Sequence, residues 1–481
     1  MSSDFELASS SVFQFCGIVL FSWCLILKRV EEMIQLVNPA TPEIVRRESY
    51  PLRRDEIVDY DPLLSFIGDA RFVLIGEASH GTHEFYRERA QITKRLITEK
   101  DFCAVAVEAD FPDANRVNRY VNGSDEDADA VDALGGFERF PAWMWRNADV
   151  LDFIGWLRAY NDDLPLTATK VGFHGLDLYS LHTSIDAVLS YLQKVDPDGA
   201  LRARERYSCF DHFGKDSQHY GYATAKGIAD SCEDEVARQL VEMHERSAEL
   251  ARLDGRVAAD DFFFAEQNAR LVKNAEKYYR TMYRSDVSSW NLRDLHMMET
   301  LVALDNHLSE PNKKAKIIVW EHNSHLGDAS ATEMGKRGEW NVGQLTRQRY
   351  KDDAILIGFT TYNGTVTAAS NWGGDAERKR VRPALAGSYE KLFHDTELER
   401  FLLLMGEGSH VSATLRSPLL ERAIGVIYRP ETERQSHYFQ SSLSRQFDAV
   451  IHIDETRAVE PLERSVKWET GEVLETFPSG M

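Results

Sequence analysis

The chain has 481 residues, of which 43% are hydrophobic and 28% are charged, the proportions of a folded globular protein. A chain of that length is longer than one ordinary hydrophobic core can accommodate, which indicates an α/β body with a second module. The net charge of -21 at pH 7 argues against a nucleic-acid backbone or an anionic membrane surface as partner. We therefore expect no nucleic acid and no stable membrane partner.

The five cysteines lie far apart in the sequence, at Cys16, Cys24, Cys103, Cys209 and Cys232. They show no CxxC spacing, so the pattern favours neither a zinc knuckle nor a disulfide framework. Cys103 falls in an apolar run and is expected to lie inside a strand. Reduced thiols fit a cytoplasmic location, which we expect.

The first residues differ from the rest, because Val12–Leu27 is strongly apolar and is followed by Lys28 and Arg29. The run is shorter than the roughly 20 residues that span a bilayer. The acidic residues before it are wrong for a secretory signal. A weak anchor, a signal-like segment and an upstream start with Met33 as the true beginning remain open, and we favour the last.

Short apolar runs without alternation recur along the chain and predict strands buried on both faces of a mostly parallel sheet. They are Phe72–Gly76, Cys103–Glu108, Lys170–Gly175, Lys316–Trp320, Ala354–Thr360, Arg422–Tyr428 and Asp448–Ile453. Helical patterns at Thr82–Glu99 and Asp149–Tyr160 separate the early runs. Alternating β and α elements predict an α/β fold with flanking helices.

From about Thr183 to Leu308 the strand pattern disappears, and apolar residues recur at three- and four-residue spacing over Glu233–Arg252, Phe262–Arg284 and Asn291–Leu308. We predict an inserted helical module that covers the cleft. Asn363-Gly364 predicts a tight turn that joins two hairpin strands. The expected units are therefore an N-terminal extension (1–44), an α/β body (45–182 and 309–465) interrupted by the helical insertion (183–308), and a C-terminal tail (466–481).

Imidazole and carboxylate groups follow three of the predicted strands. Glu77 and His80 come after the first, Glu108 ends the second, and Glu321-His322-Asn323-Ser324-His325 follows the fourth. Ligands of open α/β sheets bind at the carboxyl ends of the strands. We therefore expect these distant segments to meet in one cleft, as in an enzyme.

His80 is the candidate base, because an imidazole can take a proton from water near neutral pH. Either Glu77 or Glu108 could hold its other nitrogen. His322 and His325 could stabilise negative charge on a carbonyl oxygen. Alternatively, both could join His80 in a three-histidine metal site.

Further candidates surround this set. Arg89, about two turns into its helix, could reach back to Glu77 or Glu108, or hold a substrate oxygen. Asp177 and Arg429 each follow a predicted strand and, with Trp145, are candidate substrate-binding residues. The chain has no G-x-S-x-G elbow, and Ser79 directly adjoins His80, so we expect attack by water rather than by serine.

Several of these motifs together resemble the erythromycin esterase family. They are Gly76-Glu77-x-x-His80-Gly81, Arg89, Val107-Glu108-x-Asp110 and Trp320-x-His322-Asn323-x-His325, and the resemblance runs from about Ser49 to Leu462. It implies a metal-independent hydrolase, without a cofactor, that opens macrolide lactones and so inactivates an antibiotic. His80 would activate water, with Glu77, Glu108, Arg89, His322 and His325 around it.

We therefore predict a hydrolase of small-molecule esters or lactones, macrolides among the candidates. Two alternatives stay open. One is a metal-dependent hydrolase that uses the histidine cluster, and the other is a small-molecule or haem-binding relative without turnover. The sequence does not decide the natural substrate or the oligomeric state.

Overall fold

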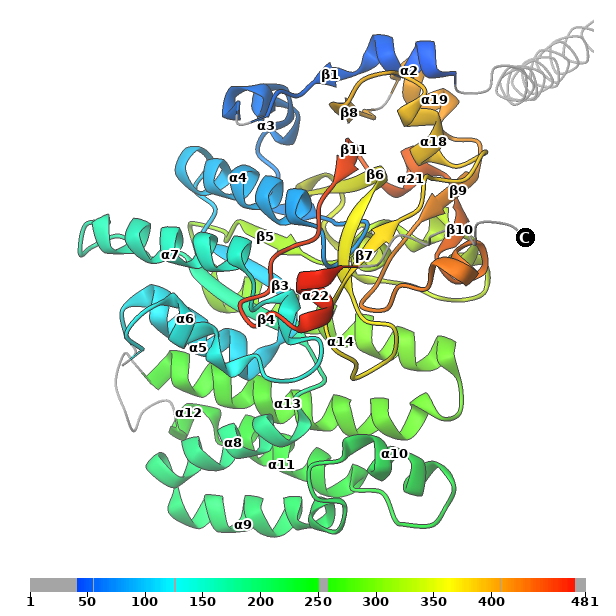
Figure 1. Ribbon diagram of the computed structural model, residues 1–481. Helices are drawn as coiled ribbons and strands as arrows, with labels where there is room; N and C mark the ends of the chain where they lie inside the picture. Colours follow the sequence, from blue (N-terminus) through cyan, green and yellow to red (C-terminus); the bar gives the residue numbers. More distant parts are fainter. Residues whose placement is uncertain (1–40, 55, 125–126, 251–257, 407, 472–481) are drawn as a thin grey trace, which may run out of the picture.

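The computed structural model describes residues 41–54, 56–124, 127–250, 258–406 and 408–471 (Figure 1). The apolar segment at 12–27 lies outside these residues. Within them, no helix combines the length and the apolar character that crossing a bilayer would require.

One large sheet forms the centre of the molecule (Figure 1). Nine strands of the described residues pair in the order β1-β8-β11-β6-β2-β5-β3-β4, with β7 added on β6. From β11 to β4 all neighbours are parallel, whereas β1, β7 and β8 pair antiparallel. The predicted fold class, a mostly parallel α/β sheet with flanking helices, is confirmed. The strands are β1 (Tyr50–Pro51), β2 (Phe72–Ile75), β3 (Ala104–Asp110), β4 (Gly172–Asp177), β5 (Ile317–Trp320), β6 (Ala354–Ala368), β7 (Glu377–Val381), β8 (Arg400–Leu404) and β11 (Ala449–Thr456).

Both faces of this sheet are buried, because successive strand residues point to opposite sides. Val73 and Ile75 of β2 belong to one core, and Phe72 and Leu74 belong to the other. The first core lies against α3 (Asp61–Ile67), α4 (His83–Lys100), α5 (Phe111–Asn122), α6 (Ala130–Ala133) and α7 (Ala148–Asp163). The second lies against α2 (Pro42–Glu48), α14 (Asp286–Leu308), α17 (Val342–Tyr350), α18 (Tyr389–His394), α19 (His410–Thr414) and α21 (Leu443–Gln446).

Between β4 and β5 the described elements are all helical, and they form the lower layer of Figure 1. They are α8 (Leu181–Val195), α9 (Pro197–Tyr207), α10 (Ser217–Ala225), α11 (Glu233–Glu245), α12 (Ser247–Leu250), α13 (Ala258–Met282) and α14. This layer has a core of its own, to which Leu189, Ala203 and Val272 contribute. Helix α14 differs, because its buried side packs on the sheet.

A disulfide between Cys209 and Cys232 crosses the helical layer. The expectation that no cysteines pair is therefore wrong. The two cysteines lie 23 positions apart in the sequence, and no short motif predicts such a bond. Cys103 lies directly before β3 rather than inside it and is a free thiol.

Two local predictions fail for reasons that bear on the site. Residues 423–428 form no strand, because their backbone pairs instead with the turn after β2, as in the bond from Ile424 N to Ala78 O (2.8 Å). Asn363-Gly364 makes no hairpin turn, because β6 runs straight through it. Gly364 adopts a φ of 136° there, and a Cβ would lie 2.0 Å from the Thr456 carbonyl oxygen of β11.

The remaining short elements complete the C-terminal third. A second small sheet pairs β9 (Leu419–Arg422) with β10 (Tyr438–Ser441). The short helices are α15 (Asn323–Leu326), α16 (Glu333–Lys336), α20 (Glu433–Ser436) and α22 (Val466–Thr470). Part of the expected C-terminal tail is thus helical, and Trp468 of α22 donates to Thr367 of β6 at 2.7 Å.

Candidate active site

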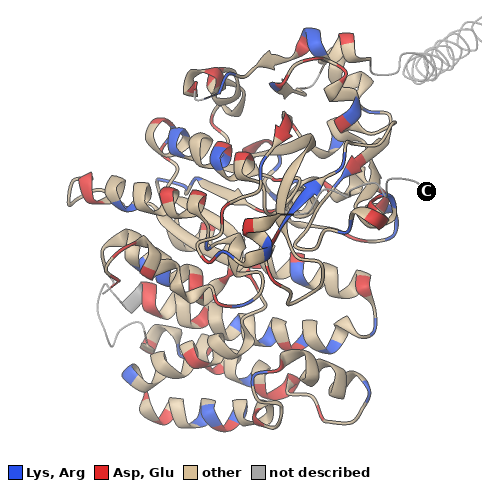
Figure 2. Cartoon of the chain, viewed as in Figure 1, with Lys and Arg blue, Asp and Glu red and all other residues tan. Residues whose placement is uncertain are grey.

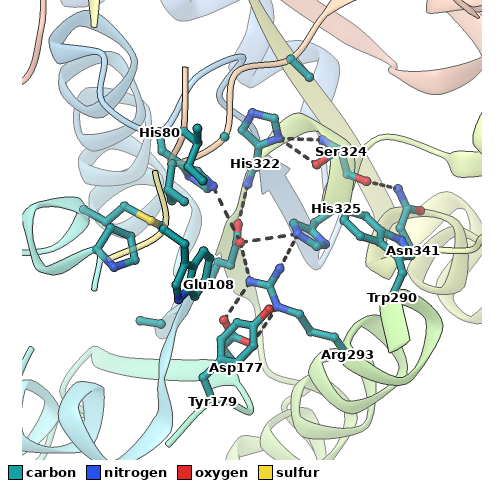
Figure 3. Close-up of a pocket in the computed structure, with 18 of the residues that line it drawn as sticks. His80, Glu108, Asp177, Tyr179, Trp290, Arg293, His322, Ser324, His325 and Asn341 are labelled. Atoms are coloured by element: carbon teal, nitrogen blue, oxygen red, sulfur yellow. Dashed lines mark hydrogen bonds and ion pairs between the residues drawn. The ribbon is translucent and has the colours of Figure 1, made fainter. Parts of the chain in front are cut away.

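Four adjacent parallel strands carry the site at their carboxyl ends. The order β2-β5-β3-β4 places the residues after β2 and β5 beside the ends of β3 and β4. His80, Glu108, Asp177, His322 and His325 line one cavity of about 500 Å³ (Figure 3). The expected meeting of distant segments is therefore present.

His80 sits in the turn between β2 and α4 and is 6% exposed. Its Nδ1 lies 2.9 Å from Glu77 Oε1, and its Nε2 lies 3.9 Å from Glu108 Oε1. Glu77 is thus the carboxylate that fixes the His80 ring. The sequence had left the choice between Glu77 and Glu108 open. With Nδ1–H donating to Glu77, the basic Nε2 belongs to the cavity side.

Arg89 reaches back along α4 as predicted, and its Nη2 lies 3.1 Å from Glu77 Oε2. Arg89 is 1% exposed, and the cavity wall does not include it. Its ring neighbours are Tyr86 and Trp320, over which its guanidinium lies at 4.4 and 5.0 Å. Arg89 therefore positions Glu77 rather than reaching into the cavity.

Glu108 is the centre of the polar network in Figure 3. Its Oε1 accepts from Arg293 at 2.7 Å, and its Oε2 accepts from the His322 backbone N–H at 2.9 Å. Burial raises the pKa of Glu108, but His325, His80 and Arg293 lower it more, so the net pKa falls well below its usual range. Glu108 therefore stays ionised across the neutral range.

Arg293 is the main residue that the sequence reasoning did not select. Its guanidinium makes a two-point contact with Asp177 at 2.9 and 2.8 Å and contacts Glu108 as well. Arg293 comes from α14, 116 positions after Asp177, and not from a strand end. The sequence does mark the group Trp290-Asn291 with Arg293-Asp294 as a further candidate, but not among the preferred site residues.

His325 is held from three sides. Its Nδ1 lies 3.0 Å from Asp294, and its Nε2 lies 2.9 Å from Arg293 Nη1. The Trp290 ring stacks on it with centroids 4.4 Å apart. Burial lowers the pKa of His325, but Asp294 and Glu108 raise it more, and the net direction is upward. Because a guanidinium can only donate, Nε2 accepts from Arg293 in this geometry and Nδ1–H faces Asp294.

His322 is the N-cap of α15, and its Nδ1 accepts from the Ser324 backbone N–H at 3.2 Å. Burial and the neighbouring His80 bring the pKa of His322 well below its usual value, against the opposing charge of Glu108. The ring is therefore neutral with its proton on Nε2. The His80 and His322 rings lie 4.8 Å apart, so this donor is close to the candidate base.

Of the remaining candidates, Trp145 and Asp177 line the cavity and Arg429 does not. Arg429 is exposed and donates to the Ser370 carbonyl (3.1 Å) and to Asn371 Oδ1 (2.8 Å). Its selection rested on a predicted strand that does not form. In the parts of the chain that the structure describes, no group of three or more His, Cys, Asp or Glu side chains is arranged to hold a metal ion.

The protein has a parallel α/β sheet with ion-paired imidazoles and carboxylates at the ends of its strands. These features define a class of α/β proteins whose reactive side chains lie in a cleft rather than in the hydrophobic core. The profile described as erythromycin esterase matches residues 97–456. The chain belongs to the erythromycin esterase family.

Distant relatives agree with that assignment. Erythromycin esterase type II of Escherichia coli is 22% identical over 352 residues, which cover 70% of this chain and 81% of the relative. The putative hydrolase YbfO of Bacillus subtilis is 23% identical over 444 residues, 85% of this chain and 90% of the relative. A crystal structure described as a succinoglycan biosynthesis protein has a TM-score of 0.71 at 20% identity, covering 87% of this chain and 97% of that one. This last likeness shows the fold alone.

Proposed function

We propose that this protein hydrolyses a carboxylic ester or lactone by water that His80 activates. The observation that carries the proposal is the fixed His80 ring, whose Nδ1 is 2.9 Å from Glu77 while the residue lines the cavity. A histidine with only a structural role does not need a fixed ring that leaves one basic nitrogen free. Membership in a family of hydrolases supports the same reaction class.

In this mechanism His80 Nε2 removes a proton from water as the water oxygen attacks the substrate carbonyl carbon. Glu77 stabilises the imidazolium that forms, and Arg89 keeps Glu77 in place. Glu108 Oε1 lies 3.9 Å from Nε2, on the side of the ring where we place the attacking water.

The carbonyl oxygen becomes an oxyanion, which needs donors already in position. The Nε2–H of neutral His322 and the guanidinium of Arg293, which both line the cavity, are the donors that we assign to the oxyanion. When the tetrahedral intermediate collapses, the leaving alkoxide takes a proton from the His80 imidazolium, which returns His80 to its neutral form.

Ser79 has no support as a nucleophile in its contacts, and Ser324, whose Oγ lies 2.8 Å from His322 Nδ1, contacts a different imidazole from the proposed base His80. Ser79 is buried, its Oγ hydrogen-bonds to Thr82, and the cavity wall does not include it. Water is therefore the nucleophile that we propose, without an acyl-enzyme.

The test is a panel of esters and of lactones of increasing ring size, with erythromycin included because two relatives bear that name. Loss of a general base typically lowers the rate by about 10²–10⁴-fold, so we expect His80→Ala to lose that much kcat. The matched control is Asp149→Asn, which breaks the similar His83–Asp149 pair (2.9 Å) outside the cavity. Unchanged hydrolysis by His80→Ala would end the proposal.

A further inference from the structure

A second cavity, of about 520 Å³, shares no lining residue with the candidate active site. Its described walls come from β6, β7, the chain around the end of β11 and the chain around the end of α22. Three arginines, Arg378, Arg380 and Arg457, line it, whereas Glu455 is the one carboxylate among its described lining residues. We call it the arginine cavity. Its volume is in the range of small-molecule sites.

Two of these arginines come from one strand. Arg378 and Arg380 are two positions apart in β7, so their side chains leave the strand on the same side. Lys379 between them points to the other side, where it is 6% exposed and pairs with Glu377 at 3.3 Å. Figure 2 shows these consecutive basic residues as a blue segment of β7. In a chain with a net charge of -21, this cavity is therefore a local site of positive charge that attracts anions.

The guanidinium of Arg378 is held in place without being neutralised. Its Nη2 donates to the Glu469 carbonyl oxygen at 3.1 Å, and its Cζ lies 5.5 Å from the centre of the Trp468 ring. Among the residues that the structure describes, no carboxylate forms an ion pair with Arg378. A guanidinium that is fixed before a ligand arrives loses little conformational freedom on binding it.

Arg457 is fixed through its backbone and its Nε. The backbone N–H donates to Glu84 Oε2 at 2.7 Å, and Nε donates to Glu84 Oε1 at 3.1 Å. The Arg457 carbonyl oxygen accepts from the His83 N–H at 2.8 Å. The side chain is nevertheless 64% exposed, and a guanidinium has five N–H donors. Its two Nη groups can therefore serve a ligand while Nε keeps its contact with Glu84.

We propose that the arginine cavity binds the phosphate group of a small phosphorylated molecule, with Arg378, Arg380 and Arg457 as its ligands. A phosphate monoester presents three acceptor oxygens and a charge near −2 at neutral pH. Guanidinium groups match such oxygens two at a time. A carboxylate, with two oxygens and one charge, would use fewer of these donors. Inorganic phosphate would leave most of the volume empty, which favours a phosphate ester of a small organic molecule.

The site does not depend on the hydrolysis proposed above, because the two cavities have separate walls. A long polyanion is a poor ligand for it, since the net charge of -21 repels a nucleic-acid backbone beyond the cavity.

The experiment is calorimetry of the full chain at pH 8 with phenyl phosphate, and with phenyl sulfate as an anion of the same shape and one charge. We expect wild type to bind phenyl phosphate at least about 10-fold more tightly, because the dianion gains more from the same guanidinium groups. Arg378→Gln and Arg380→Gln should each raise the Kd of phenyl phosphate by about 10-fold, the effect of one hydrogen bond to a charged group.

The matched control is Arg416→Gln, which removes the same charge from an exposed position outside the cavity and should leave the Kd unchanged. Arg380 is exposed, so Arg380→Gln keeps the test valid even if Arg378→Gln, which loses its contact with Trp468, does not fold. Three results would each overturn the proposal. They are no saturable binding of phenyl phosphate to wild type, equal binding of phenyl sulfate, and the same Kd in Arg380→Gln as in Arg416→Gln.

Discussion

Glu77 holds two partners at once, because one oxygen faces His80 at 2.9 Å and the other faces Arg89 at 3.1 Å. We expect Glu77→Gln to lower kcat by about 10²–10⁴-fold, since an amide can hold the imidazole in the wrong tautomer. It should also lower the free energy of unfolding by roughly 3–5 kcal/mol, because the buried Arg89 charge loses its partner. Steady-state kinetics and denaturant unfolding measure the two effects.

Arg89→Met in the Glu77→Gln background separates these effects. Removing the unpaired cation should recover much of the stability while the loss of kcat remains. Recovery of kcat together with stability would show that Glu77 acts only through folding, which contradicts the positioning role.

The strand-end residues were selected from the sequence, whereas Arg293 on α14 was not, for a physical reason. An apolar run followed by a polar group marks the edge of a parallel sheet, which is how His80, Glu108 and His322 were found. Arg293 sits on a helix whose other buried residues, such as Met297, read as ordinary core. Only the packing of α14 on the sheet reveals that its first turns complete the site.

At the scale of the element, most predicted strands agree with the structure to within a few residues. The runs at Phe72–Gly76 and Lys316–Trp320 became β2 and β5 because uninterrupted apolar residues suit a sheet buried on both faces. Residues 423–428 have a similar composition but line the cavity as a strap beside the β2 turn. The composition of residues 423–428 predicts that they are buried. Whether they form a strand or a non-regular segment depends on which part of the chain their backbone pairs with.

The turn from β2 into α4 depends on a close approach of two chains. A Cβ at Gly81 would lie 1.8 Å from the Thr367 carbonyl oxygen and 2.9 Å from its Cα, both backbone atoms of β6. Gly81→Ala should therefore separate the turn from β6 and lower stability by roughly 3 kcal/mol or more, with loss of activity, since His80 is the adjoining residue. Thermal unfolding and ester hydrolysis measure both.

A matched glycine serves as the control, because its replacement by alanine should raise stability rather than lower it. Gly155 lies on the exposed side of α7 with nothing within 4 Å of its added Cβ. Gly155→Ala should stabilise the protein by about 1 kcal/mol through helix propensity. A loss of stability in Gly155→Ala, or none in Gly81→Ala, would contradict the packing of these two elements.

For the whole molecule, buried carboxyl groups set how stability depends on pH. Burial raises the pKa of Glu421 to about 8 and that of Asp113 to about 7, with Glu390 adding to the first and Asp110 to the second. The folded protein thus keeps protons that the unfolded chain releases near pH 4–4.5. Where the native state binds more protons, stability falls as pH rises. Between about pH 5 and 8, Glu421 and Asp113 therefore make the protein more stable at the acidic end of the range. The ionised Glu108 and Asp177, by contrast, lose their contribution to stability only at much lower pH.

Glu421→Gln isolates this effect at one position, 0% exposed in β9. The amide carries no proton equilibrium, so the stability of the variant should fall less between pH 5 and 8.5 than that of wild type, with the remaining fall due to Asp113. The difference between the two proteins should grow over that window by at most about 5 kcal/mol, the ideal value for a shift of this size. Denaturant unfolding at both pH values measures it, with the exposed Glu431→Gln as control. Parallel curves for Glu421→Gln and wild type would mean that Glu421 is ionised in the folded protein.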